Sequence, residues 1–187
     1  VGKVVNIASR CAGFIARRFE GKLSDSLPRP DLYDAFVAAK ENIAADFEGR
    51  NYQSAIRRIM QLADEANRYI DEEKPWQQIK EQGRESHVQA VCTQGINLFS
   101  VLMSYLSPVL PFTAERAGAF LGRDISAWSN INEPLLGVAV NTFQPLLTRI
   151  DPLKVSAMIE ASRDSLQPAS QNSAADNGPA IDELAPE

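Results

Sequence analysis

Apolar residues recur along this chain at spacings of three and four, and the alternation of apolar and polar residues that marks strands is scarce. A period near 3.6 residues indicates amphipathic helices. The predicted helices cover residues 1–19, 31–49, 51–72, 88–106, 113–121 and 152–166. The 88–106 segment is the most apolar, so we expect it at the centre of a helical bundle.

Capping residues and prolines suggest where these helices begin and end. Asp31 and Thr113 are N-cap candidates, because their side chains can accept a hydrogen bond from the first helical turn. Pro75 interrupts the helical pattern, and a short helical turn can follow it as far as Gln82. The pair Asp151-Pro152 combines an N-cap with a proline at the first helical position.

The fold class that follows is all-α, a bundle of about five main helices plus a C-terminal helix. We expect the bundle over residues 1–122. Residues 123–166, an irregular segment and the last helix, should pack back on it. Residues 167–187 are rich in Ala, Ser, Asn, Pro and acids and contain no aromatic residue, which predicts a disordered linker.

Composition and charge exclude some functional classes. The chain has 187 residues and a formal charge of −5, and 44% of its residues are hydrophobic. No apolar run approaches the roughly 20 residues that span a bilayer, and no secretory signal opens the chain, so we expect no membrane partner. The negative total averages an acidic tail with a basic N-terminal stretch, residues 1–22, which carries Lys3, Arg10, Arg17, Arg18 and Lys22. A polyanion responds to that local field more than to the total.

The sequence contains no pattern of catalytic or metal-binding residues. It lacks a Gly-rich phosphate loop, and Cys11 and Cys92 have no ligand-type spacing, so we expect two buried or half-buried thiols. The one histidine, His87, lies in a polar stretch and is predicted to be solvated. We therefore expect no catalytic residue, no metal and no cofactor in this chain.

Polar residues form a stripe along the first predicted helix. Lys3, Asn6, Arg10, Gly13 and Arg17 follow one another at intervals of 3, 4, 3 and 4, which places them on one face. An amide, a planar guanidinium and the open space over a glycine could together read base edges or follow a phosphate backbone. The same pattern also fits an ordinary solvated helix face.

Trp76 follows the Pro75 break directly. An exposed indole between two helices is a platform on which a splayed base can stack. Alternatively, the ring fills the gap between two helix ends. Trp128 lies in the irregular segment, and we expect it to serve packing.

Seven short stretches of the chain resemble one protein family. They are similar to the anticodon-binding domain of bacterial methionyl-tRNA synthetases. The stretches are VGKVVNIASR at residues 1–10, ADEANRYI at 63–70, KPW at 74–76, GINLF at 95–99, PVLP at 108–111, PLLG at 134–137 and RID at 149–151. The resemblance spans about residues 1–166. The combination of VNxASR with a following PW pair is its most specific part.

This resemblance implies recognition of the CAU anticodon of methionine tRNA. It assigns stacking on the first anticodon base, cytosine, to Trp76, and the angle of that ring to Pro75. Asn6 and Arg10 are implied to hydrogen-bond to anticodon bases or backbone. Lys3, Gly13 and Arg17 are candidates for RNA backbone contacts.

The resemblance also implies a parent enzyme, a methionine-tRNA ligase whose catalytic domain uses ATP and magnesium. The HIGH and KMSKS signatures of that domain do not occur here, so we expect a catalytically inactive fragment. Its expected partners are methionine tRNA and the catalytic domain, toward which residues 123–166 would fold, and not DNA. The fragment is expected to be monomeric and cytoplasmic.

Two alternatives remain open from the sequence. One is a helical protein-interaction module that uses the polar stripe and Trp76 as a hot spot. The other keeps tRNA as the partner but changes the amino acid, to that of another class I synthetase such as the leucine or cysteine enzyme. Full burial of Trp76, out of reach of Arg10, would contradict anticodon recognition.

Overall fold

The computed structural model describes residues 2–147 and 152–166. These residues form helices, and their one β-type pairing is an isolated bridge between Lys22 and Ala139. The predicted all-α class is therefore confirmed. In chain order the elements are α1 (Gly2–Arg18), α2 (Pro30–Ala38), α3 (Lys40–Glu48), α4 (Tyr52–Glu73), α5 (Pro75–Gln78), α6 (Glu85–Leu106), α7 (Pro111–Leu121), the 3-10 helix η1 (Trp128–Asn132) and α8 (Pro152–Leu166).

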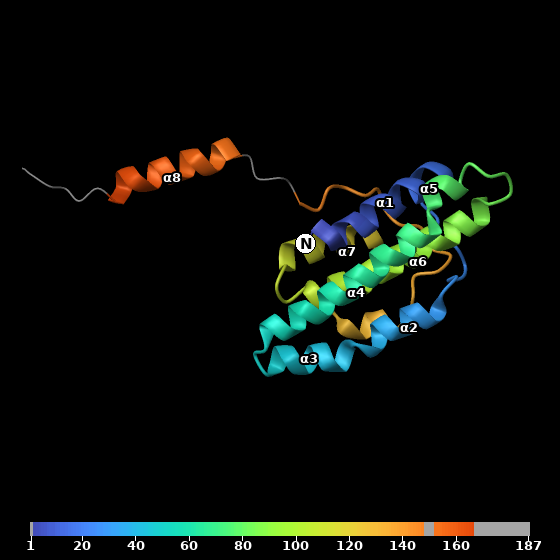
Figure 1. Ribbon diagram of the computed structural model, residues 1–187, viewed down its shortest axis with the longest axis horizontal. Coiled ribbons are helices and arrows are strands. Elements are labelled where there is room, and N and C mark those ends of the chain that lie inside the picture. The colour runs from blue at the N-terminus through green and yellow to red at the C-terminus, as the bar shows by residue number, and fades with distance from the viewer. Residues whose placement is uncertain (1, 148–151, 167–187) are drawn as a thin grey trace, which may run out of the picture. The chain divides into compact units, whose positions relative to one another are not determined.

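Residues up to Leu147 form one compact unit, and α8 belongs to a second unit. In the first unit α6 contacts α1, α2, α4, α5, α7 and η1, and every residue from Val91 to Leu106 is buried. Figure 1 shows α6 running through the middle of this unit, with α1 and α4 beside it. The prediction that the most apolar segment forms the centre is correct.

Buried polar side chains on α6 attach the irregular segments to the bundle. Thr93 Oγ1 accepts a hydrogen bond from the Ser24 amide at 2.9 Å. The Asn97 carboxamide accepts from the Leu135 amide at 2.6 Å and donates to the Leu135 carbonyl at 2.9 Å. Because loop backbone groups need partners when they are buried, these side chains fix the path of the chain over α6.

The segment after α7 packs on the bundle. Ile125, Ile131 and Leu146 belong to the hydrophobic core. Trp128 contacts the Tyr105 ring edge-on, with 5.1 Å between ring centroids. The predicted packing role of Trp128 is therefore confirmed. The predicted linker at 167–187 and the predicted N-cap Asp151 lie outside the described residues.

Helix starts differ from the prediction at two places. α2 begins at Pro30 and α7 at Pro111, so neither Asp31 nor Thr113 is an N-cap. Asp31 instead pairs with Arg29, at 2.7 Å, and Thr113 is buried. Proline fits the first helical position because its φ is already helical and no amide hydrogen is needed there.

The predicted helix over 31–49 is in fact two helices, α2 and α3, that meet at Ala39. The Tyr105 hydroxyl of α6 donates to the Phe36 carbonyl at 2.7 Å and contacts the Val37 carbonyl at 3.3 Å. A side chain that takes helix carbonyls competes with the amides four residues on, which is a known cause of kinks. The break therefore depends on a residue 68 or 69 positions away in the sequence.

Candidate nucleic-acid interface

α1 and α4 lie side by side and run in the same direction (Figure 1). Lys3 Nζ is 2.6 Å from Asp64 Oδ1, and Arg10 Nη2 is 2.6 Å from Asp71 Oδ1. Each pair joins residues 61 positions apart, so the register between the helices is constant over these two turns. The polar stripe predicted on α1 therefore lies next to a matching stripe on α4.

Arg10 and Trp76 are in direct contact. The Arg10 Cζ atom lies 4.4 Å from the centroid of the Trp76 ring, a geometry in which the guanidinium is attracted to the indole face. The Arg10 side chain is 25% exposed, and Trp76 is half-buried. The condition that would have contradicted anticodon recognition, a fully buried Trp76 away from Arg10, is not met.

Asp71 also contacts the guanidinium of Arg10. Its carboxylate is 59% exposed, so solvent screens the ion pair and its net stabilisation is small. The ion pair also affects the orientation of Arg10. One guanidinium nitrogen is directed to the carboxylate while the guanidinium carbon lies over the indole ring. In the unbound chain Arg10 thus contacts both Asp71 and Trp76.

The chain places Trp76 at a sharp break between α4 and α5. Lys74 adopts a left-handed conformation with φ of 47°, which ends α4. Pro75 is buried and starts α5, and the Trp76 ring packs partly against the hydrophobic core. The predicted proline break is confirmed, although α5 ends at Gln78 and not near Gln82.

Asn6 lies one helical turn before Arg10 on the same side of α1. It is exposed, and its carboxamide makes no hydrogen bond within the described part of the chain. The carboxamide can therefore both donate to and accept from an incoming polar group.

The other stripe residues differ in how accessible they are. Lys3 is exposed but paired with Asp64. The prediction of open space above Gly13 is wrong, because a Cβ placed there would lie 3.1 Å from Arg17 Nη2. Long side chains on a helix lean toward the preceding turn, which brings the Arg17 guanidinium back over Gly13.

Two features of this face were missed by the sequence reasoning. The acids Asp64 and Asp71 neutralise two of the basic residues of α1, and their spacing of seven matches that of Lys3 and Arg10. His87, in the first turn of α6, is not simply solvated. Its Nε2 lies 3.1 Å from Oε2 of Glu73, the last residue of α4. Only the packing of α1 and α6 against α4 reveals these pairs.

Cys11 and Cys92 lie behind the interface, and both thiols are buried as predicted. A hydrogen bond with Cys11, together with burial, raises the pKa of the Cys92 thiol. Cys92 belongs to the hydrophobic core, and a thiol kept neutral by a raised pKa is a poor nucleophile.

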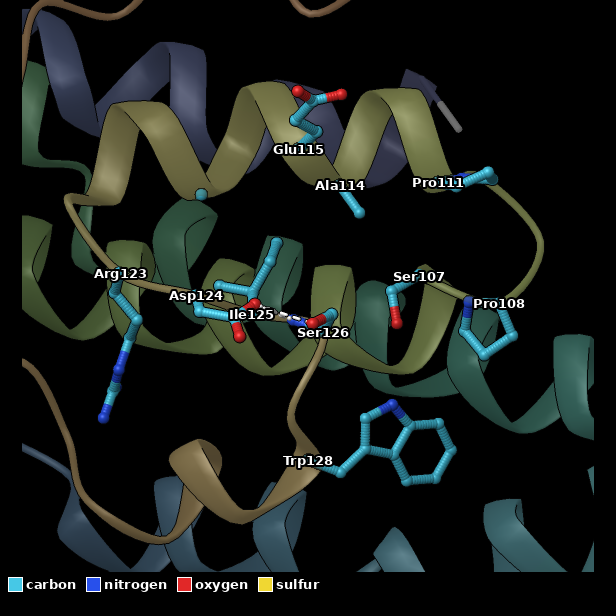
Figure 2. A pocket seen from close by; sticks show the side chains of 11 residues that line it. Ser107, Pro108, Pro111, Ala114, Glu115, Arg123, Asp124, Ile125, Ser126 and Trp128 are labelled. Atoms are coloured by element: carbon cyan, nitrogen blue, oxygen red, sulfur yellow. Dashed lines mark hydrogen bonds between the residues drawn. The ribbon is translucent and has the colours of Figure 1, made fainter.

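A surface pocket of the first unit lies elsewhere. It has a volume of about 470 Å³ and lies between the α6–α7 turn and residues 123–128. Figure 2 shows Pro108, Pro111 and Trp128 around it, and none of the predicted site residues lines it. The described residues contain no cluster of His, Cys, Asp or Glu suited to a metal, and none of their helices is long and apolar enough to cross a membrane.

Comparison with known proteins places these features in a family. Residues 32–145 match the model of the anticodon-binding domain of tRNA ligases. The methionine–tRNA ligase of Stenotrophomonas maltophilia (strain R551-3) is 50% identical over 181 residues, covering 94% of this chain and 26% of that protein. The methionine–tRNA ligase of Xylella fastidiosa (strain 9a5c) is 50% identical over 169 residues, covering 90% and 24%. The chain thus spans about a quarter of the length of these relatives.

Solved structures agree on the fold. The ligand-free methionyl-tRNA synthetase of Mycobacterium tuberculosis aligns with a TM-score of 0.72 at 18% identity, covering 80% of this chain and 32% of that one. Its complex with methionyl-adenylate aligns with a TM-score of 0.71. At this identity the likeness establishes the helical architecture alone. The family match covers more than half of the sequence. This chain therefore belongs to the anticodon-binding domain family of tRNA ligases.

Proposed function

We propose that this chain recognises the CAU anticodon of methionine tRNA, as the anticodon-binding part of a methionine-tRNA ligase. The observation that carries the proposal is the contact of Arg10 with Trp76, beside the exposed Asn6. An aromatic ring, a guanidinium fork and an amide on one surface are the groups with which proteins bind unstacked bases.

Each of these residues has a distinct role in the proposal. Trp76 stacks on the first anticodon base, and Pro75 sets the direction of its ring. Arg10 now occupies an indole face, and its fork can turn from the ring to base edges or backbone when a base arrives. Such changes of side-chain rotamer are common on binding. Asn6 hydrogen-bonds to bases or backbone, and Lys3, Gly13 and Arg17 follow the RNA backbone along α1.

The ligase reaction itself belongs to the parent enzyme, in which a separate catalytic domain uses ATP and magnesium to charge the tRNA. This chain contributes the choice of tRNA. The two relatives at 50% identity are both methionine–tRNA ligases, which supports methionine over leucine or cysteine as the amino acid.

A protein-interaction module is the competing class. It would use the same exposed stripe, but it gives no reason for an arginine directed at an indole face next to an amide with no partner in the described chain. The two relatives at 50% identity are methionine–tRNA ligases, which favours RNA over a protein as the partner of this face.

Titration with RNA tests the proposal. The chain is titrated with an anticodon stem-loop carrying CAU and with the same stem-loop carrying a different first base. We expect tighter binding of CAU and a loss of affinity as salt is added, because phosphate contacts release counterions. Equal affinity for the two loops would refute the methionine assignment. Binding of neither loop at low salt would refute anticodon recognition.

A further inference from the structure

The break that presents Trp76 is closed by side chains outside the proposed contact surface. The Gln78 carboxamide, on α5, donates to the Glu73 carbonyl at the end of α4 with a distance of 2.6 Å. The same nitrogen lies 3.5 Å from Glu73 Oε2. These contacts reach across Pro75 and Trp76, so they join the two ends of the segment that carries the ring.

The Glu73 carbonyl needs such a donor. In a continuous helix the Gln77 amide would bond to it, but here the Gln77 and Gln78 amides both bond to the Lys74 carbonyl. Pro75 has no amide hydrogen to offer. Within the described residues the Gln78 side chain is the group that caps this carbonyl.

The cap is fixed from two further directions. Arg84, in the loop before α6, donates to Gln78 Oε1 at 3.1 Å. His87, in the first turn of α6, lies 3.1 Å from Glu73 Oε2, and these two side chains are 36% and 30% exposed. Arg84 also faces Glu81, at 3.8 Å. The end of α4, the α5 turn and the start of α6 are thus connected through one set of hydrogen bonds.

From these contacts we infer that Gln78 is a positioning residue for Trp76, supported by Glu73, Arg84 and His87. It touches no RNA in this scheme. It keeps the α4–α5 break at one angle, so that the indole face remains opposite Arg10. The inference rests on the proposed function for its consequence, since a fixed ring lowers the ordering cost of base stacking.

Fluorescence of Trp76 tests this directly. Trp128→Phe leaves Trp76 as the one tryptophan of the chain, and it keeps an aromatic ring in contact range of Tyr105. In that background Gln78→Met removes the carboxamide while keeping the side-chain length. The matched control is Gln77→Met, an identical change at the exposed neighbour. Arg84→Met is a second variant, which removes the donor to Gln78 Oε1 together with the exposed ion pair to Glu81.

We expect Gln78→Met to raise the acrylamide quenching constant of Trp76 by about twofold. Its affinity for the CAU stem-loop should fall by about three- to tenfold, which is the range for one lost hydrogen bond. Arg84→Met should change both in the same direction by less, and Gln77→Met should change neither. Circular dichroism confirms that all variants are folded.

The outcomes are separable. Unchanged quenching in Gln78→Met overturns the positioning inference, whatever the RNA does. Increased quenching with unchanged affinity also overturns it, because the ring would then be held without benefit to binding. If the parent chain binds no anticodon loop, the proposed function fails, and the positioning of the ring is still decided by the quenching.

Discussion

At the scale of single residues, the orientation of one guanidinium determines what the interface can offer. Arg10 is held between the Asp71 carboxylate and the Trp76 ring, and both contacts come from residues that are more than 60 positions away in the sequence. The stripe on α1 could be predicted from helical spacing. The acid beside it could not, because the register of α1 against α4 is a property of packing.

Replacing Arg10 with lysine separates charge from shape. Arg10→Lys keeps the positive charge and the ion pair with Asp71 but loses the planar fork that can bond to a base in two places. We expect affinity for the CAU stem-loop to fall by about tenfold in a calorimetric titration, with little change in the free energy of unfolding. Arg18→Lys, at an exposed position of the same helix, is the matched control and should bind as the parent chain does.

Removing the indole tests the platform itself. Trp76→Ala should weaken binding of the CAU stem-loop by about 1–3 kcal/mol, the cost of one base–aromatic stack. Because Trp76 is only half-buried, its loss should destabilise the fold by less than the roughly 3–5 kcal/mol typical of a core aromatic. Thermal unfolding followed by circular dichroism measures this. A collapse of stability with unchanged affinity per folded molecule would make Trp76 a packing residue.

At the scale of elements, helix existence followed from periodicity, but helix boundaries depended on chemistry that the periodicity does not contain. Pro30 and Pro111 start α2 and α7, although Asp31 and Thr113 are good capping residues. The two prolines were visible in the sequence, and they could have indicated these helix starts. The break at Ala39 has no such signal, because the Tyr105 hydroxyl that accompanies it comes from α6.

At Gly95, α6 packs tightly against side chains of α1 and α4. A Cβ there would lie 2.6 Å from Cys11 Sγ and 2.9 Å from Ile70 Cδ1. We expect Gly95→Ala to destabilise the chain by about 1–3 kcal/mol through overpacking, measured by urea unfolding. Gly2→Ala is the control, since a Cβ at Gly2 meets nothing within 4 Å. A Gly95→Ala variant as stable as the parent chain would mean that the three helices can separate at little cost.

An ion pair between α3 and α4 should make stability depend on pH. A hydrogen bond from the Arg58 guanidinium holds the pKa of Asp46 below its ordinary value. The pair therefore stabilises the fold fully above the unfolded pKa of about 3.9, and the contribution is lost as pH falls through the lower folded pKa.

Asp46→Asn isolates this contribution. The variant should be less stable than the parent chain near neutral pH, and the difference should disappear in acid, as urea unfolding at a series of pH values can show. A difference that persists unchanged below the folded pKa of Asp46 would indicate that the aspartate acts through its shape alone.

At the scale of the whole molecule, the interface is a product of the bundle. α6 is buried along its length, and α1, α4 and α5 pack on it so that Asn6, Arg10 and Trp76 occupy neighbouring positions. The resemblance to a known family pointed to these residues, and the structure shows Arg10 and Trp76 in contact.

The central claim, that Trp76 stacks on the first anticodon base, is tested most directly by a double-mutant cycle across the interface. The chain and its Trp76→Ala variant are each titrated with the CAU stem-loop and with the same loop lacking the first anticodon base. We expect the loss of the base to cost the parent chain about 1–3 kcal/mol of binding free energy and to cost the variant almost nothing. An equal loss in both chains would show that the first base binds elsewhere and would contradict the account.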